Sequence, residues 1–115
     1  MELELKRGGR TARVETLGGE LVSYRDERGL EYIWGGDPAY WPGRNPLLFP
    51  IVGMLKEGKI RFDGREYAME RHGFARRREF TPAARGEDWV RLELRESAET
   101  LALYPYPFRL AVEQR

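Results

Sequence analysis

The chain has 115 residues and a formal net charge of +1; 41% of its residues are hydrophobic and 34% are charged. This length suits one domain or part of one, and the composition is typical of a soluble globular protein. Because cysteine is absent and histidine occurs once, disulfides, thiolate metal sites and zinc sites with several histidine ligands are excluded within one chain. Acidic and basic residues are interleaved, which argues against a nucleic-acid partner.

The first ten residues, MELELKRGGR, are charged throughout and lack the apolar stretch of a secretory signal. No window approaches the roughly 20 apolar residues of a membrane-spanning helix. We therefore expect a cytoplasmic protein with no membrane partner. Arginine and glutamate greatly outnumber lysine, asparagine and glutamine, and the predicted loops are rich in proline, which fits a thermophilic source.

Apolar and polar residues alternate with a period of two in several segments, and no helical periodicity recurs. This pattern predicts strands with one buried face. The alternating segments, in chain order, are residues 2–6, 12–17, 59–70 and 89–96. Asp63-Gly64 divides the third segment and predicts a tight hairpin. A second hairpin is predicted between ELVSY and EYIW, with its turn near Arg28-Gly29.

Residues 35–53, GGDPAYWPGRNPLLFPIVG, contain four prolines that prevent regular strand pairing. We expect an ordered, aromatic-rich loop there and a shorter one of the same kind at residues 103–108, LYPYPF. The spacing of the predicted strands favours an all-β fold of seven to nine strands, arranged as an antiparallel sandwich or barrel.

The only histidine, His72, follows a predicted strand and precedes Gly73, which allows close approach of backbone or ligand. Imidazole moves protons near neutral pH and donates well to sugar oxygens. The alternative interpretation is a histidine bonded to backbone at a strand end.

Aromatic and arginine side chains near this histidine could bind a sugar. The aromatic candidates are Tyr40, Trp41, Phe49 and Phe74, and the arginines are Arg44 and Arg76, which could donate forked hydrogen bonds to hydroxyl or phosphate groups. Alternatively, the aromatic side chains belong to the core, and Arg76 pairs with Glu70 or Glu79. Asp37 and Glu57 are the nearest candidate acids outside regular strands. Asp37 is better explained as a turn residue, and Glu57 as a residue at the end of a hairpin.

Three segments together resemble the aldose 1-epimerase (galactose mutarotase) superfamily, in particular its LacX-like branch. They are GGELVSYRDERGLEYIWGGDPAYW, NPLLFPIVGMLKEGKI and RHGFARRREF, and LYPYPFRLAVEQR is similar to a later segment of the family. The pairing of LFPIVG with HGFAR is the specific part of the resemblance. It implies that residues 1–115 form a single partial domain of a galactose mutarotase-like β-supersandwich.

The resemblance also implies a reaction. A base removes the proton of the anomeric hydroxyl of an aldohexose or related sugar, an acid protonates the ring oxygen, and the opened ring recloses as the other anomer without a cofactor. By resemblance, His72 matches the first of two active-site histidines. Met54 stands where many members carry a sugar-binding arginine. The predicted substrate-binding residues are therefore Arg44, Arg76, Trp41, Phe74 and Met54.

The second histidine and the glutamate base of the family have no counterpart in these 115 residues. Three functions therefore remain open: a mutarotase-like enzyme, a non-catalytic sugar-binding module, and a β-sandwich for protein contacts. We also expect a homodimer or higher homo-oligomer, because half of a sandwich leaves strand edges and apolar faces to be covered.

Overall fold

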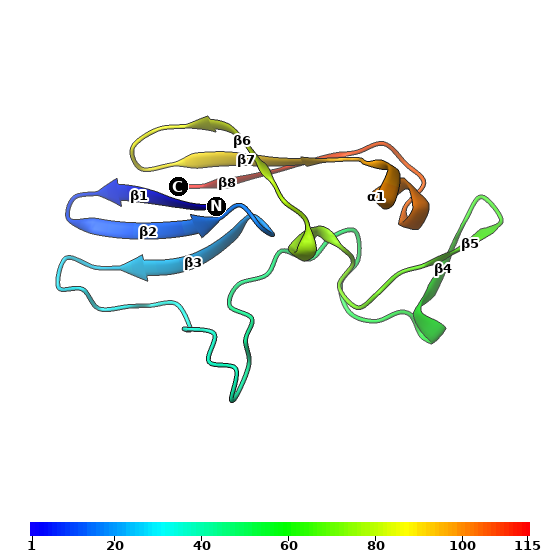
Figure 1. Ribbon diagram of the computed structural model, residues 1–115, viewed down its shortest axis with the longest axis horizontal. Helices are drawn as coiled ribbons and strands as arrows, with labels where there is room; N and C mark the ends of the chain where they lie inside the picture. Colours follow the sequence, from blue (N-terminus) through cyan, green and yellow to red (C-terminus); the bar gives the residue numbers. More distant parts are fainter.

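The computed structural model describes residues 1–115 and contains eight strands, one α-helix and two short 3-10 turns. The strands are β1 (Glu2–Arg7), β2 (Arg10–Glu15), β3 (Glu20–Arg25), β4 (Lys59–Phe62), β5 (Arg65–Ala68), β6 (Thr81–Arg85), β7 (Val90–Arg95) and β8 (Arg109–Gln114); the helix α1 spans Ala98–Leu103. All strand pairs are antiparallel and form three sheets with the orders β1-β2-β3, β4-β5 and β6-β7-β8 (Figure 1). The all-β antiparallel fold and the expected number of strands are confirmed.

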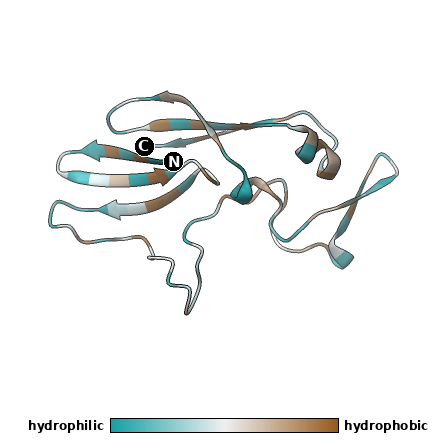
Figure 2. Ribbon diagram, in the orientation of Figure 1, coloured by the Kyte–Doolittle hydropathy of each residue, from teal (hydrophilic) through white to brown (hydrophobic).

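The two three-stranded sheets pack through one hydrophobic cluster. Leu3 and Leu5 of β1 and Val14 of β2 meet Leu92 and Leu94 of β7 in it, and none is more than 7% exposed. The neighbours of these residues in sequence are polar and point away, so hydrophobic and hydrophilic residues alternate along β1 and β7 (Figure 2). Burial of one face of each sheet therefore defines the sandwich and fixes the register of its strands.

The molecule is flat and extended. Its principal dimensions are 54 × 35 × 17 Å and its radius of gyration is 16.3 Å, against roughly 13 Å for a compact domain of this length. Its accessible surface is 7600 Å², whereas about 6,500 Å² is expected for a monomer of this mass. The fold therefore leaves more surface uncovered than a closed sandwich does.

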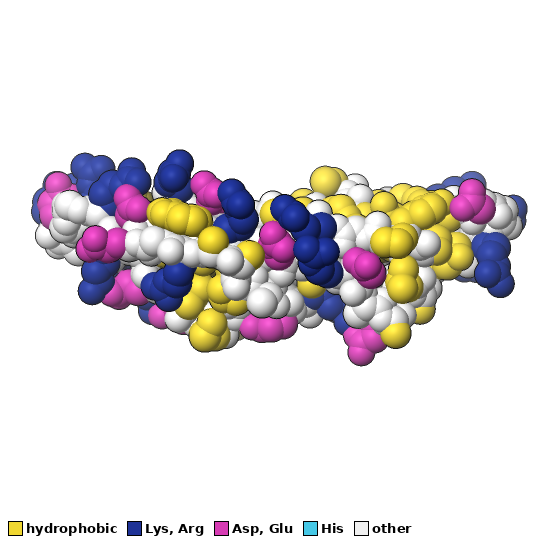
Figure 3. All heavy atoms as spheres, turned by 90° about the horizontal axis from the view of Figure 1, so that it is seen from above, with side chains coloured by type: hydrophobic (Ala, Val, Ile, Leu, Met, Phe, Trp, Pro, Cys, Tyr) yellow, Lys and Arg dark blue, Asp and Glu magenta, His cyan; other side chains and the backbone are white.

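The β4-β5 hairpin projects from the sandwich beside α1 (Figure 1). Its turn is Asp63-Gly64, both with positive φ (51° and 77°), as predicted from the sequence. Phe62 of β4 contacts Tyr104 and Tyr106 edge-on, with ring centroids 5.5 Å apart in each case. Hydrophobic side chains gather at this end of the molecule (Figure 3). Aromatic packing thus attaches the hairpin to the segment that follows α1.

Three details differ from the sequence prediction. The helix α1 was not expected; its N-cap residue is Ser97, whose side chain and that of Thr100 form a capping box. Strand β6 was not expected either, since its sequence TPAAR lacks alternation and all five residues are exposed. The second predicted hairpin is reduced to one bridge, between Arg25 and Glu31.

The start of the chain is fixed to the sandwich. The Met1 ammonium group donates to Thr16 Oγ1 (2.9 Å) and to Glu15 Oε2 (3.3 Å), and Thr16 also bonds Glu79. Thr16 is 1% exposed, and its carbonyl oxygen accepts from the Phe80 amide at 2.9 Å. These contacts connect the end of β2 to the segment that leads into β6. No helix has the length and apolar character needed to cross a membrane.

Candidate functional site

The backbone of Gly53 holds His72 in place through two hydrogen bonds, one to its imidazole ring and one to its backbone. The Gly53 amide donates to His72 Nδ1, and the His72 amide donates to the Gly53 carbonyl oxygen, each at 2.8 Å. Because Nδ1 accepts a hydrogen bond, the hydrogen of the neutral ring lies on Nε2. Nε2 has no protein partner and is not a buried unsatisfied atom. The half-buried imidazole therefore has one nitrogen engaged by backbone and one free donor.

The turn at His72-Gly73 is dictated by close contact with the loop. His72 has φ 65° and Gly73 has φ 71°. The Phe49 carbonyl oxygen accepts from the amides of Phe74 (2.9 Å) and Ala75 (3.2 Å), and a Cβ on Gly73 would overlap this oxygen. Only glycine fits there, since it lacks a Cβ and tolerates positive φ. The two segments LFPIVG and HGFAR are thus joined into one unit.

Residues 35–53 form the expected ordered loop without regular strands, and it contains a cis peptide bond between Phe49 and Pro50. Glu20 Oε1 accepts from the amides of Arg44 (3.2 Å) and Asn45, and the Arg44 guanidinium donates to the Gly35 carbonyl oxygen at 3.2–3.3 Å. These polar contacts hold the first half of the loop, and Leu47, Phe49 and Ile51 pack its second half against the core.

The loop exposes aromatic rings. Tyr40 is 82% exposed and Trp41 is 50% exposed; the Trp41 carbonyl oxygen accepts from Trp34 Nε1 at 2.9 Å. Asp37 is a turn residue, as expected: its side chain accepts from the Ala39 amide at 2.9 Å. These rings are available to a flat ligand.

Four of the six predicted site residues fall into two groups. His72 and Met54 flank Gly53, and Met54 is 68% exposed. Trp41 and Arg44 lie in the loop portion that surrounds Gly35, and no hydrogen bond joins them to His72. Phe74 is 1% exposed and packs against Phe49 and Phe108, with centroids 6.0 and 5.9 Å away. Its ring lies in the core, beneath the His72-Gly73 turn.

Arg76 has no acidic partner. Its guanidinium donates to the Arg71 carbonyl oxygen at 3.0 Å, and its Nε is buried without a hydrogen bond. The pairing of Arg76 with Glu70 or Glu79, considered from the sequence, is not formed; Arg77 pairs with Glu70 instead, at 3.0 Å. The terminal N–H groups of Arg76 make no other hydrogen bond within the protein.

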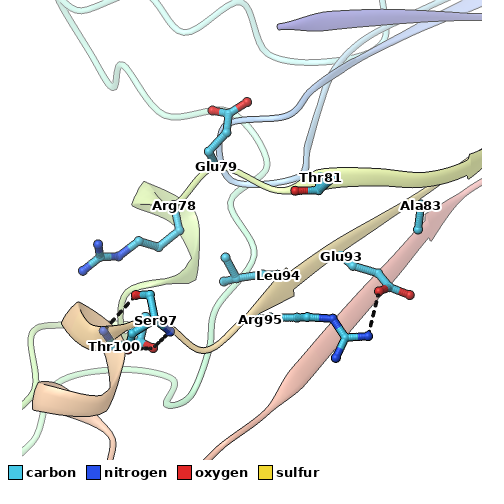
Figure 4. Close-up of a pocket in the computed structure, with 9 residues that line it drawn as sticks. All are labelled: Arg78, Glu79, Thr81, Ala83, Glu93, Leu94, Arg95, Ser97 and Thr100. Atoms are coloured by element: carbon cyan, nitrogen blue, oxygen red, sulfur yellow. Dashed lines mark hydrogen bonds and ion pairs between the residues drawn. The ribbon is translucent and has the colours of Figure 1, made fainter.

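A surface hollow of about 450 Å³ lies elsewhere, between β6, β7 and the start of α1 (Figure 4). None of the predicted site residues lines it. Its charged groups already have partners: Arg78 pairs with Glu99, and Glu93 lies 3.7 Å from Arg95. Ser97 and Thr100 cap the helix (Figure 4). No group of three or more His, Cys, Asp or Glu side chains is placed to hold a metal ion.

The carboxylate with the largest pKa shift is also outside the site. Burial favours the neutral form of Glu31, yet hydrogen bonds from Ser23, the amides of Tyr24 and Ile33, and Arg25 outweigh it and lower the pKa of the Glu31 carboxyl to about 2. Asp26, in the same turn, has a lowered pKa because Arg28 donates to it. Both acids fix the turn after β3.

The open antiparallel sandwich, with a histidine held against a proline-rich loop, has the galactose mutarotase-like fold. Its backbone matches the galactose mutarotase-like protein of Lactobacillus casei with TM-score 0.95 and 30% identity, over 98% of this chain and 39% of that one. It also matches the galactose mutarotase related enzyme of Lactobacillus acidophilus with TM-score 0.96 and 28% identity, over 98% of this chain and 38% of that one.

The sequence comparison agrees with the fold. The profile of the aldose 1-epimerase family matches residues 1–115. The plasmid-borne protein LacX of Lactococcus lactis subsp. lactis is 41% identical over an alignment of 117 positions, which covers 97% of this chain and 39% of that protein. The chain belongs to the aldose 1-epimerase family and spans about 39% of the length of the curated relatives it matches.

Several residues that build the site were not identified from the sequence. Gly53 was noted only as the end of the loop, although it binds both the backbone and the ring of His72. Glu20 was read as part of a strand, whereas its carboxylate anchors the loop. The sequence feature that could have identified Gly53 as a site residue is its position in the LFPIVG motif, on which the family resemblance rests. Glu20 had no local signal, since its partners lie 24 and 25 positions away.

Proposed function

We propose that this chain binds or acts on an aldohexose or a related sugar, with His72 as its principal hydrogen-bond donor. One observation carries the proposal: in a member of the aldose 1-epimerase family, the sole histidine is held by Gly53 so that its Nε2–H is free. A neutral imidazole in this tautomer donates to an oxygen but cannot accept a proton at Nδ1 without losing its backbone bond.

The residues around His72 have separate roles in this proposal. Met54 and Trp41 offer exposed apolar surface to the C–H face of a sugar ring, while Arg44 and Arg76 donate to hydroxyl groups with the N–H groups that they have free. Phe74 supports the turn from the core. Since Arg44 and His72 belong to separate groups, the ligand would have to span the loop to contact both.

In mutarotation the anomeric hydroxyl loses its proton, the bond from C1 to the ring oxygen breaks, and that oxygen gains a proton. The resulting aldehyde rotates about C1–C2 and closes by the reverse steps. His72 would donate to the sugar and orient it for ring opening. The chain has no second histidine to complete an acid–base pair with it. We therefore assign His72 a supporting role.

A non-catalytic sugar-binding module that self-associates is the second candidate function. The single histidine of these 115 residues favours it, because a site can bind a sugar without a matched acid and base. In either case we propose that residues 1–115 form a single partial domain located in the cytoplasm of a thermophilic source, and that the chain forms a homodimer or higher homo-oligomer.

The test is anomer exchange of glucose and galactose, followed by NMR, together with binding of the same sugars. His72→Ala removes the ring. His72→Asn also removes it, but asparagine tolerates positive φ and can accept from the Gly53 amide. Arg71→Ala is the control, since it alters a neighbouring exposed side chain that makes no hydrogen bond.

Exchange above the spontaneous rate that is lost in both His72 variants and kept in Arg71→Ala would support the enzyme. Sugar binding without exchange, weakened by the same two variants, would favour the binding module. A folded chain that neither binds nor interconverts either sugar would refute both functions.

A further inference from the structure

The turn that carries His72 has a backbone conformation that a residue with a side chain disfavours. The Gly73 amide donates to the Glu70 carbonyl oxygen at 3.0 Å, so residues 70–73 form a β-turn. In this turn His72 has φ 65°, whereas Arg71 is not in the left-handed region. A positive φ at the third position alone defines a type II turn, in which glycine or asparagine is preferred there. Histidine at this position therefore needs contacts that hold the turn against the commoner type I conformation.

The peptide group between Arg71 and His72 distinguishes the two turn types, because it faces in opposite directions in them. Both of its polar groups are bonded in the observed orientation. The His72 amide donates to the Gly53 carbonyl oxygen at 2.8 Å. The Arg71 carbonyl oxygen accepts from Arg76 Nη2 at 3.0 Å. Reversal of this peptide would break both bonds and give His72 a negative φ, which would move its ring away from the Gly53 amide.

The backbone of Arg76 is fixed against the sandwich. Arg76 lies in the 3-10 turn Ala75–Arg77, and its carbonyl oxygen would lie 2.9 Å from a Cβ on Gly18. The Gly18 amide also donates to the Arg78 carbonyl oxygen at 2.8 Å. These contacts seat the 3-10 turn on the bend that follows β2. The Arg76 side chain therefore reaches the Arg71 carbonyl group from a fixed base.

Arg76 differs from the two arginines that follow it in what its side chain bonds. Arg77 and Arg78 each form an ion pair with a glutamate, whereas Arg76 bonds no carboxylate. Its Nε is buried, so part of the guanidinium group is packed inside the protein. The contact with the Arg71 carbonyl oxygen is the one hydrogen bond of this side chain. A hydrogen bond from a charged donor is about twice as strong as one between neutral groups, so this contact can hold the peptide in its orientation.

We propose that Arg76 is a positioning residue for His72. Its guanidinium group holds the peptide between Arg71 and His72 in the type II orientation, which keeps Nδ1 on the Gly53 amide and leaves Nε2–H free for the ligand. One Nη2–H group serves this role, which is separate from the donation to hydroxyl groups proposed above. The inference rests on the proposed function for its sugar ligand, but the orientation of the turn can be measured without a sugar.

Arg76→Ala removes the bond to the Arg71 carbonyl oxygen. We expect the Gly53 and His72 amides to exchange hydrogen about tenfold faster or more, because a hydrogen bond from a charged group no longer holds the turn. The nitrogen NMR resonances of the imidazole should show that its hydrogen is no longer confined to Nε2. Arg76→Lys keeps a charged donor and should restore part of the protection. Arg76→Met keeps the unbranched stem without a donor, and it gives the same comparison if Arg76→Ala does not fold.

Two comparisons separate the orientation of the turn from packing around Arg76. In a His72→Gly background the third turn position adopts a positive φ without strain, so Arg76→Ala should change the exchange of the amide at position 72 very little. Arg77→Ala is the matched control, because it removes a neighbouring exposed arginine that pairs with Glu70 and does not bond the turn carbonyl group. Sugar affinity, measured by NMR titration with glucose and galactose, should fall in Arg76→Ala and be unchanged in Arg77→Ala.

Unchanged amide exchange and imidazole resonances in a folded Arg76→Ala or Arg76→Met variant would overturn the proposal. Loss of sugar binding with an unchanged turn would overturn it too, since Arg76 would then act by contacting the sugar. So would an equal effect of Arg76→Ala with histidine and with glycine at position 72. A wild type that binds no sugar would refute the proposed function, while the amide and ring signals would still decide the role of Arg76.

Discussion

The sandwich and the loop at residues 35–53 are held in place by different contacts. In the sandwich, Val14, Val90 and Leu92 are fully buried, and hydrophobic packing fixes their strands. No loop residue is fully buried; Glu20 and the hydrogen bonds between Gly53 and His72 anchor the loop, and its second half packs partly buried side chains, Leu47, Phe49 and Ile51, against the core. Changes in the sandwich should therefore affect the stability of the whole fold, whereas changes at the loop anchors should affect the site first.

The largest expected effect is that of Leu92→Ala in the sandwich. Its side chain is completely buried, so truncation removes its contacts and leaves a cavity, and we expect a loss of about 3 kcal/mol in the free energy of unfolding. Leu30→Ala, at a residue 52% exposed, should change it by no more than about 0.5 kcal/mol. Urea denaturation measures both. Equal losses of unfolding free energy in the two variants would show that the cost of truncation does not depend on burial at these positions.

Gly73→Ala tests the junction between the sandwich and the loop. Alanine there adopts an unfavourable φ and displaces the Phe49 carbonyl group, and we expect a cost of about 2 kcal/mol together with loss of sugar binding. Gly29→Ala is the control, since Gly29 has φ 84° but nothing within 4 Å of the added methyl; it should cost about 1 kcal/mol. If the two variants lose the same stability, the contact with Phe49 is unimportant.

Glu20→Ala loosens the loop alone. It removes the acceptor of the Arg44 and Asn45 amides, and we expect these amides to exchange hydrogen faster while global stability falls by about 1 kcal/mol. Glu20→Gln retains an acceptor oxygen and should preserve most of the protection. Hydrogen exchange followed by NMR distinguishes the two. Unchanged exchange in Glu20→Ala would mean that other contacts hold the loop.

A last effect is the pH dependence from Glu31, whose side chain is 30% exposed and therefore partly screened by solvent. Folding lowers the pKa of its carboxyl from 4.5 to about 2. Its stabilising contribution is therefore complete above pH 4.5 and disappears as the pH falls towards 2. We expect Glu31→Gln to be less stable than the wild type at neutral pH, with the difference shrinking over that window. A difference in unfolding free energy that is independent of pH would contradict this.

The sequence predicted those parts of the fold that depend on local patterns. Alternation located β1, β2 and β7, and Asp63-Gly64 located the hairpin turn, because each signal lies within a few residues. Strand β6 escaped prediction because its residues are all exposed, so pairing with β7 alone defines it. The helix α1 is too short for periodicity, and only its capping residues marked it.

For the site, the sequence singled out His72. The alternative interpretation, a histidine bonded to backbone, is correct for Nδ1, which accepts from the Gly53 amide. The identity of the partner could not be predicted, because Gly53 is 19 positions away and the contact depends on how the loop folds. The same applies to Phe74, whose burial against Phe49 and Phe108 requires three distant segments to meet. The roles of the predicted sugar-binding residues remain predictions.

The anchoring of Met1 affects how the protein should be handled at the bench. Its free ammonium group bonds Thr16 and Glu15 and lies 3.9 Å from Glu79, so acetylation or an amino-terminal affinity tag would remove a charge from the place where β2 meets the approach to β6. Stability and hydrogen-exchange measurements are therefore best made on a tag-free chain that keeps the Met1 ammonium group.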